Sequence, residues 1–117
     1  MEKGYKKLIV WQKSDEFAYQ AYLASKEFPR EEIYGITSQF RRAALSIPTN
    51  IVEAMGRQNR RESKQFINIA LGSMAETEYL LEFCKRLGYL KNDQFVYLEE
   101  MRNRVGALLW KFYLSFN

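Results

Sequence analysis

Apolar residues recur at steps of three and four along most of the chain, which is the spacing that lines one side of an α-helix. The pattern predicts four helices, over about residues 10–27, from 32–36 to 55, from 60 to 87, and from 92 or 93 to the end. No segment shows the two-residue alternation of a half-buried strand. Because short connections make successive helices antiparallel, we expect an all-α fold, an antiparallel up-down-up-down four-helix bundle that forms a single domain over residues 1–117.

Local signals mark the ends of these helices. Gly56 and Gly88 are expected to stop the second and third helices in the left-handed conformation that glycine adopts easily. Asn59 followed by Glu62 has the spacing of a capping box, in which two side chains bond reciprocally to backbone N–H groups at a helix start. Pro48 lies inside the second helix, where its ring removes a donor and crowds a carbonyl, so we expect a bend or a local opening there.

The length and the apolar pattern limit where the protein acts. A chain of 117 residues is long enough to bury one real core. It has no run of about 18 apolar residues, and its N-terminal segment lacks an apolar stretch of signal-peptide length. We therefore expect a cytoplasmic protein that does not enter the membrane. Cys84 falls at core spacing between Leu80 and Leu87, which favours a buried reduced thiol over a nucleophile.

Several features that catalysis needs are missing or badly placed. The chain has no histidine, which is the commonest general base and metal ligand. Neighbouring carboxylates, as in Glu76 with Glu78 or Glu99 with Glu100, point in different directions from a helix. The sequence has no recognisable catalytic triad, metal-ligand set or phosphate-binding loop. We expect no enzymatic activity, no catalytic residue, no cofactor and no bound metal.

The excess positive charge is concentrated in one stretch. The net charge is +4, and residues 41–64 account for all of it with six cations and two carboxylates: Arg41, Arg42, Arg57, Arg60, Arg61 and Lys64 against Glu53 and Glu62. A local basic excess permits a polyanionic partner such as RNA or DNA, whereas exposed arginines are also ordinary solvated surface. Nucleic-acid binding is therefore a hypothesis that the charge allows and does not require.

The candidates for nucleic-acid contact fall into two groups. The first comprises Arg57, Arg60, Arg61 and Lys64, and the second comprises Arg41 and Arg42. The first group is expected at one end of the bundle, where arginine forks and a lysine charge bind backbone phosphates without reading sequence. The second group lies about 24 Å away along a helix that rises about 1.5 Å per residue. It fits nucleic-acid binding on a ring of subunits, and ion pairs within or between subunits, equally well.

Two polar residues of the second helix are interpreted as structural. Asn50 occupies one step of the apolar stripe, where a buried amide limits the available packings and so fixes register. A ligand contact is the alternative role for Asn50. Glu53 is expected to support Asn50 or to pair with an arginine, and neither residue has a catalytic partner.

The chain has more apolar surface than one bundle interior needs. The last helix adds several large apolar residues to its core set: Leu109, Trp110, Tyr113, Leu114 and Phe116. Gly72 and Gly106 lie inside helices, where glycine costs about 1 kcal/mol relative to alanine unless a neighbouring helix approaches closely. These features favour self-association, with a tight monomeric core as the alternative. The aromatic spacing is typical of core and interface, so we do not expect base stacking.

The sequence resembles a known bacterial family along nearly its whole length. The matching segments are Leu8-Ile9-Val10-Trp11-Gln12-Lys13, Phe28-Pro29, residues 34–57, Ile69-Ala70-Leu71-Gly72-Ser73-Met74-Ala75-Glu76 and Leu87-Gly88-Tyr89-Leu90. These residues are similar to those of the 23S rRNA intervening-sequence proteins, a family that includes the accessory variability proteins of diversity-generating retroelements. Ala54 and Ser63 depart from the family pattern, which often has glycine at the first position and an apolar or aromatic residue at the second.

The resemblance implies an antiparallel four-helix bundle assembled into a ring, commonly a pentamer, with a basic surface. It also implies a non-enzymatic role, because some members are encoded within ribosomal RNA genes and retroelement members bind nucleic acid and a reverse transcriptase. Together with the local charge, it favours a homo-oligomeric helical protein that binds structured RNA or other nucleic acid electrostatically. The alternative is a protein-interaction scaffold or accessory subunit for a partner such as a reverse transcriptase, with nucleic-acid binding incidental.

Overall fold

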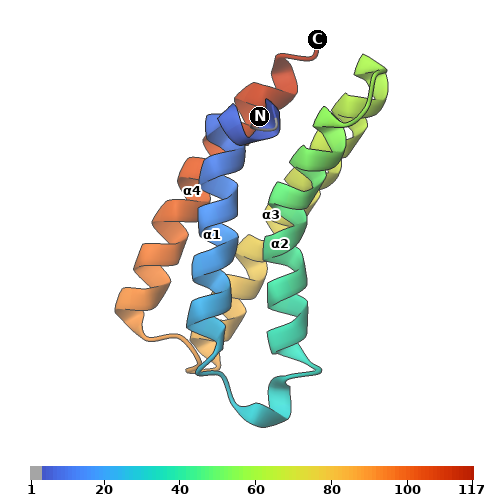
Figure 1. Cartoon of the computed structure of the whole chain (residues 1–117). Coiled ribbons are helices and arrows are strands. Elements are labelled where there is room, and N and C mark those ends of the chain that lie inside the picture. Colours follow the sequence, from blue (N-terminus) through green and yellow to red (C-terminus); the bar gives the residue numbers. More distant parts are fainter. Residues whose placement is uncertain (1–3) are drawn as a thin grey trace.

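The computed structural model describes residues 4–117, and within them the chain is all-helical. The elements are η1 (Gly4–Lys7), α1 (Ile9–Ser25), η2 (Arg30–Glu32), α2 (Ile36–Met55), α3 (Arg60–Arg86) and α4 (Asn92–Leu114), where η denotes a short 3-10 helix. Successive α-helices run in opposite directions (Figure 1). Each packs against two others, since α1 contacts α2 and α4, and α3 also contacts α2 and α4. The predicted antiparallel four-helix bundle is confirmed.

This topology brings distant parts of the sequence together at each end of the bundle. The start of α1, the end of α2, the start of α3 and the end of α4 lie at the upper end in Figure 1. The opposite end holds the turn from α1 to α2, which includes η2, and the turn from α3 to α4. The molecule measures 43 × 27 × 24 Å, so groups at the two ends are well separated.

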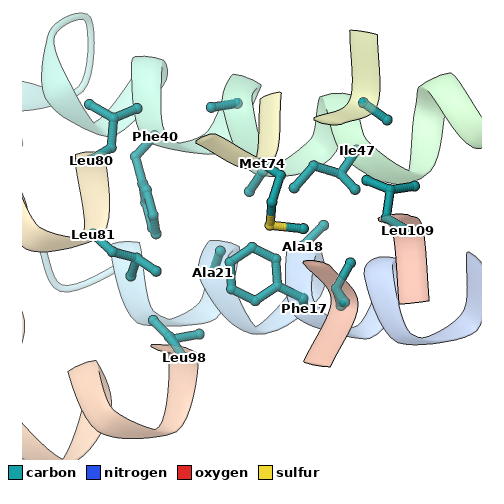
Figure 2. Packing of buried hydrophobic residues seen from close by; sticks show 14 of the residues in the cluster. Phe17, Ala18, Ala21, Phe40, Ile47, Met74, Leu80, Leu81, Leu98 and Leu109 are labelled. Carbon is teal, nitrogen blue, oxygen red and sulfur yellow. The ribbon is translucent and has the colours of Figure 1, made fainter. Parts of the chain in front are cut away.

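All four α-helices contribute fully buried side chains to one core. Phe17 comes from α1, Phe40 and Ile47 from α2, Leu81 from α3, and Leu98 and Leu109 from α4, as Figure 2 shows together with their neighbours. Burying an aliphatic or aromatic side chain of this size stabilises the fold by about 1.5–3 kcal/mol relative to leaving it exposed. Cys84 is also fully buried and free, as its position in the apolar stripe predicted.

The helix ends confirm some of the local predictions and correct others. Asn59 caps α3, because its Oδ1 accepts hydrogen bonds from the backbone N–H groups of Arg61 (2.8 Å) and Glu62 (3.3 Å). Only this half of the expected capping box forms, since within residues 4–117 the Glu62 side chain makes no return bond to the Asn59 N–H. Gly88 ends the α3 region with φ +80°, in the predicted left-handed region. The left-handed stop expected at Gly56 is wrong. Gly56 has φ −84°, and its N–H still donates to the carbonyl of Val52 as in a continuing helix.

Pro48 does not interrupt the second helix. The α2 helix runs from Ile36 to Met55 with Pro48 buried inside it. The helix is therefore not opened at this position. Among the described helices, none is both long and apolar enough to cross a membrane.

Candidate nucleic-acid interface

Four cations from the predicted first group lie together at one end of the bundle. Arg57 directly follows the end of α2, and Arg60, Arg61 and Lys64 occupy the first two turns of α3. A hydrogen bond links the two helices across this connection, because the buried Ser63 hydroxyl donates to the carbonyl of Ala54 at 2.8 Å. The two positions that depart from the family pattern therefore contact each other at the base of this turn.

Three of these cations lie over aromatic rings. The Arg57 guanidinium is 4.6 Å from the centre of the Phe66 ring, and the Arg60 guanidinium is 5.0 Å from that of Phe116. The Lys64 ammonium is 4.7 Å from the centre of the Tyr113 ring. A ring face attracts a cation without neutralising its charge. The aromatic residues hold these side chains in place while leaving their positive charge available to an anion.

Residues that directly follow α4 accept hydrogen bonds from two of these cations. Arg60 Nη2 donates to the carbonyl of Ser115 at 2.5 Å, and Lys64 Nζ donates to the side-chain oxygen of Asn117. Arg57 forms an ion pair with Glu53 at 3.0 Å, in which both side chains are well exposed. Such surface pairs contribute about 0–1 kcal/mol. Of the two roles expected for Glu53, the structure supports pairing with an arginine.

The fold adds further cations to this end. Lys6 and Lys7 come from η1, and Lys111 comes from the last turn of α4. We call this surface the basic end; it comprises Lys6, Lys7, Arg57, Arg60, Arg61, Lys64 and Lys111, with Glu53 and Glu62 as the accompanying carboxylates. The sequence did not indicate that these three lysines would join this end, because they lie far from residues 41–64 in the chain. The positive excess at this end is thus larger than the sequence stretch alone indicated.

Arg41 and Arg42 are separate from the basic end and differ from each other. Arg41 Nε donates to the Ser25 hydroxyl at 2.7 Å, and its guanidinium lies 4.9 Å from the centre of the Tyr22 ring, so it links α2 to α1. Arg42 is exposed and lines a groove of about 800 Å³ between α2 and α3, together with Glu76. Within residues 4–117 neither arginine forms an ion pair.

Asn50 belongs to a polar seam between α2 and α3. Its amide nitrogen donates to the Ser46 carbonyl at 2.8 Å and to the Ser46 hydroxyl at 2.9 Å, and that hydroxyl lies 2.8 Å from the Ser73 hydroxyl. Asn50 is half-buried, not fully buried as the apolar stripe suggested. These bonds link Asn50 to α3 through Ser46 and Ser73, and the role in register that was expected for Asn50 stays a prediction.

Arg102 is a buried cation that was not among the residues predicted to have a role. Arg102 is only 7% exposed. Its guanidinium pairs with Glu99 on α4, and it also pairs with Glu78 on α3 at a distance of 3.2 Å. The sequence does indicate a buried ion pair here, because Arg102 falls at core spacing between Leu98 and Val105, where an arginine requires a carboxylate partner. Over the described part of the chain, no three histidine, cysteine, aspartate or glutamate side chains are grouped as metal ligands would be.

Comparisons with known proteins agree with this architecture. The family model described as 23S rRNA-intervening sequence protein matches residues 6–111. A crystal structure of a protein with unknown function from the S23 ribosomal protein family of Bacteroides thetaiotaomicron is similar, with 31% identity and a TM-score of 0.82 over 90% of this chain and 98% of that chain. The comparison with curated proteins gives no significant match. The chain belongs to the 23S rRNA-intervening sequence protein family.

Proposed function

We propose that this protein is a non-enzymatic, cytoplasmic helical bundle that self-associates and binds structured RNA or other nucleic acid through its basic end. The observation that carries the proposal is the gathering of seven cations, with only two accompanying carboxylates, at one end of the bundle. Nucleic-acid backbones carry closely spaced phosphates, and neutralising them releases condensed counterions, which favours binding. Arginine forks and lysine charges bind those phosphates without reading base sequence.

Self-association is supported by the outer face of α3. Gly72 and Ala75 are exposed there, and the Tyr79 side chain one turn further on is exposed too. A Cβ atom on Gly72 would meet nothing within 4 Å, so nothing inside the bundle requires a glycine at this helical position. A second copy packed against this face provides a reason for the missing side chain. We expect the ring, a pentamer, that the family resemblance implies, in which the basic ends repeat around the axis.

The proposal is tested by measuring RNA binding across a salt series. We expect the triple variant Arg57→Ala, Arg60→Ala, Arg61→Ala to bind a fluorescent RNA hairpin at least tenfold more weakly than the wild type. Each lost phosphate contact should also reduce the slope of log affinity against log salt by about 0.9 on duplex. Fluorescence anisotropy gives the affinities, and circular dichroism checks that the variant remains folded.

A matched control removes the same charge elsewhere. Arg30, Arg86 and Arg104 are exposed and lie away from the basic end, so changing these three to alanine lowers the net charge equally. We expect this control to retain most of the affinity. Absence of binding at low salt, or an equal loss in both triple variants, would contradict a localised nucleic-acid interface.

A second candidate function is a protein-interaction scaffold or accessory subunit, for example for a reverse transcriptase. Tyr34 favours it, because its side chain is 96% exposed beside the groove between α2 and α3. Tyrosine is enriched at protein interfaces, where its ring fills a partner's pocket. Recovery of one defined protein after nuclease treatment, and its loss with Tyr34→Ser, would favour this function over nucleic-acid binding.

A further inference from the structure

An exposed aromatic pair lies beside the basic end on the last turns of α4. The rings of Trp110 and Tyr113 are stacked, with centroids 5.6 Å apart and planes inclined by 20°. Trp110 is 52% exposed, and so keeps much of its ring surface outside the core. The core is already filled by Val105 and Leu109 of the same helix. Core packing therefore does not account for the exposed surface of Trp110.

Cations and amides adjoin this aromatic pair. A surface hollow of about 620 Å³ is lined by Tyr113 together with a set of α3 residues: Arg61, Lys64, Gln65, Asn68 and Ile69. Lys64 lies against the Tyr113 ring, and Arg61 is exposed one turn before it. Gln65 and Asn68 have no intrachain hydrogen bond from their amide groups within residues 4–117. These amides are available to a bound molecule.

The three kinds of side chain match the three parts of a nucleotide. Arginine and lysine bind phosphate, an aromatic face stacks on a base, and an amide donates and accepts hydrogen bonds at a base edge. A duplex presents phosphates but keeps its base faces stacked internally, so it can use only the cations. A strand with unpaired bases can use all three groups at once.

We propose that Trp110, Tyr113 and the adjoining α3 residues bind an unpaired nucleotide of a single-stranded segment. Its base extends the stack of Trp110 on Tyr113, its phosphate contacts Lys64 and Arg61, and the Asn68 and Gln65 amides face the base edge. This inference rests on the proposed nucleic-acid binding and narrows it to strands or loops with unpaired bases. It revises the sequence-based expectation that the aromatic residues serve only the core and an interface.

The test compares three labelled probes of about twelve nucleotides, a length within the range of known single-strand sites. The first is a single strand with all its bases, made as RNA and as DNA; the second is the same strand with abasic sites; the third is a duplex. Trp110→Leu removes the π-face and retains apolar bulk. We expect about tenfold weaker binding of the base-carrying strand, with at most a twofold change for the abasic strand and the duplex.

Two further variants make the result specific. Tyr97→Leu is a matched control, because Tyr97 is 51% exposed near the start of the same helix and so lies far from the basic end, and it should leave binding of all three probes unchanged. Trp110→Phe keeps a ring and should recover part of the lost affinity. In a Trp11→Phe background Trp110 is the sole tryptophan, and its fluorescence should be quenched by the base-carrying strand and not by the abasic one.

The outcomes separate this inference from the broader function. If the wild type binds all three probes alike and Trp110→Leu changes nothing, nucleic-acid binding stands and the unpaired-base site is wrong. If Trp110→Leu lowers the solution mass and weakens all probes equally, Trp110 belongs to an interface between copies and the inference is also overturned. If no probe binds at low salt, both the proposed nucleic-acid binding and the unpaired-base site are wrong.

Discussion

The side chains at the basic end show how a cation is held without being neutralised. The Arg57 ion pair with Glu53 cancels one charge, whereas the contacts of Arg60 with Phe116 and of Lys64 with Tyr113 cancel none. Hydrogen bonds to uncharged groups of Ser115 and Asn117 restrain the same two cations. Because these side chains are already held in place, they lose less conformational entropy when an anion binds. This arrangement favours phosphate binding more than an equal number of free lysines would.

Cys84 is expected to make stability fall at high pH. Burial, assisted by the charge of Glu32, raises the pKa of its thiol from 9.0 to about 11. Between these values the unfolded chain loses the thiol proton while the folded chain keeps it, so the stabilisation is complete below pH 9 and is lost as pH rises toward 11. At about pH 11 the free energy of unfolding should therefore be about 2 kcal/mol lower than it is below pH 9.

Urea unfolding at about pH 8 and about pH 11 measures this effect. Cys84→Ala should reduce the difference between the two free energies of unfolding. The Tyr89 hydroxyl donates to Glu32 at 2.8 Å, and this bond raises the pKa of the hydroxyl. The raised pKa also makes stability fall as pH rises, and this effect remains in Cys84→Ala. An unchanged difference in Cys84→Ala would show that the thiol does not contribute.

At the residue scale, the sequence indicated contacts that are local and missed those made by folding. The Asn59 cap and the Glu53 pair with Arg57 span four residues or fewer, so the sequence already contained both partners. Lys6 and Lys111 reach the basic end only because the antiparallel topology places η1 and the end of α4 there. Its spacing placed Trp110 outside the core set of the last helix, and it is 52% exposed, whereas Leu109, which was expected outside the core as well, is fully buried.

At the element scale, periodicity predicted the helices well, and errors arose where tertiary contacts decide the ends. The first helix ends at Ser25, two residues before the predicted end, and residues 30–32 form the separate element η2. Gly56 was expected to be left-handed because glycine permits that conformation. The Ser63 bond to the Ala54 carbonyl satisfies one helix-end acceptor from α3 instead. The sequence did not show that α3 would supply this bond.

Arg102 is expected to be the polar group on which α3 and α4 most depend. Arg102→Met removes the cation from Glu99, whose second carboxylate oxygen is buried and has no hydrogen-bond partner. An uncompensated, partly buried carboxylate should lower the free energy of unfolding by about 3 kcal/mol. Combining Arg102→Met with Glu99→Gln should recover part of the loss, because the unpaired charge is then absent.

Chemical unfolding of these variants provides the measurement, and Arg104→Met provides the control. Arg104 is exposed on the same helix, so its replacement should change stability by at most about 0.5 kcal/mol. If Arg102→Met costs no more than Arg104→Met, the buried ion pair does not hold α4 against α3.

At the scale of the whole molecule, charge and apolar surface are distributed along different directions. The positive excess lies at one end of the 43 Å long axis, whereas Gly72 and Tyr79 lie on the side of the bundle along α3. Copies that pack side by side through α3 would therefore leave the basic ends uncovered. The proposed self-association and the proposed nucleic-acid binding would be compatible because they would use different surfaces, and multiple basic ends would raise avidity for a long strand.

Substitutions at Gly72 distinguish a monomeric bundle from one that packs against copies of itself. Within one subunit the position is open, so Gly72→Ala should raise the free energy of unfolding by up to about 1 kcal/mol through helix propensity. Gly72→Leu would fill the space that a neighbouring helix needs, and we expect it to lower the solution mass measured by light scattering or sedimentation. Ala107→Leu enlarges a residue that is also exposed, on α4, and it should leave the mass unchanged. A wild type that is monomeric at every concentration tested, or equal masses for the wild type and Gly72→Leu, would rule out assembly through this face of α3.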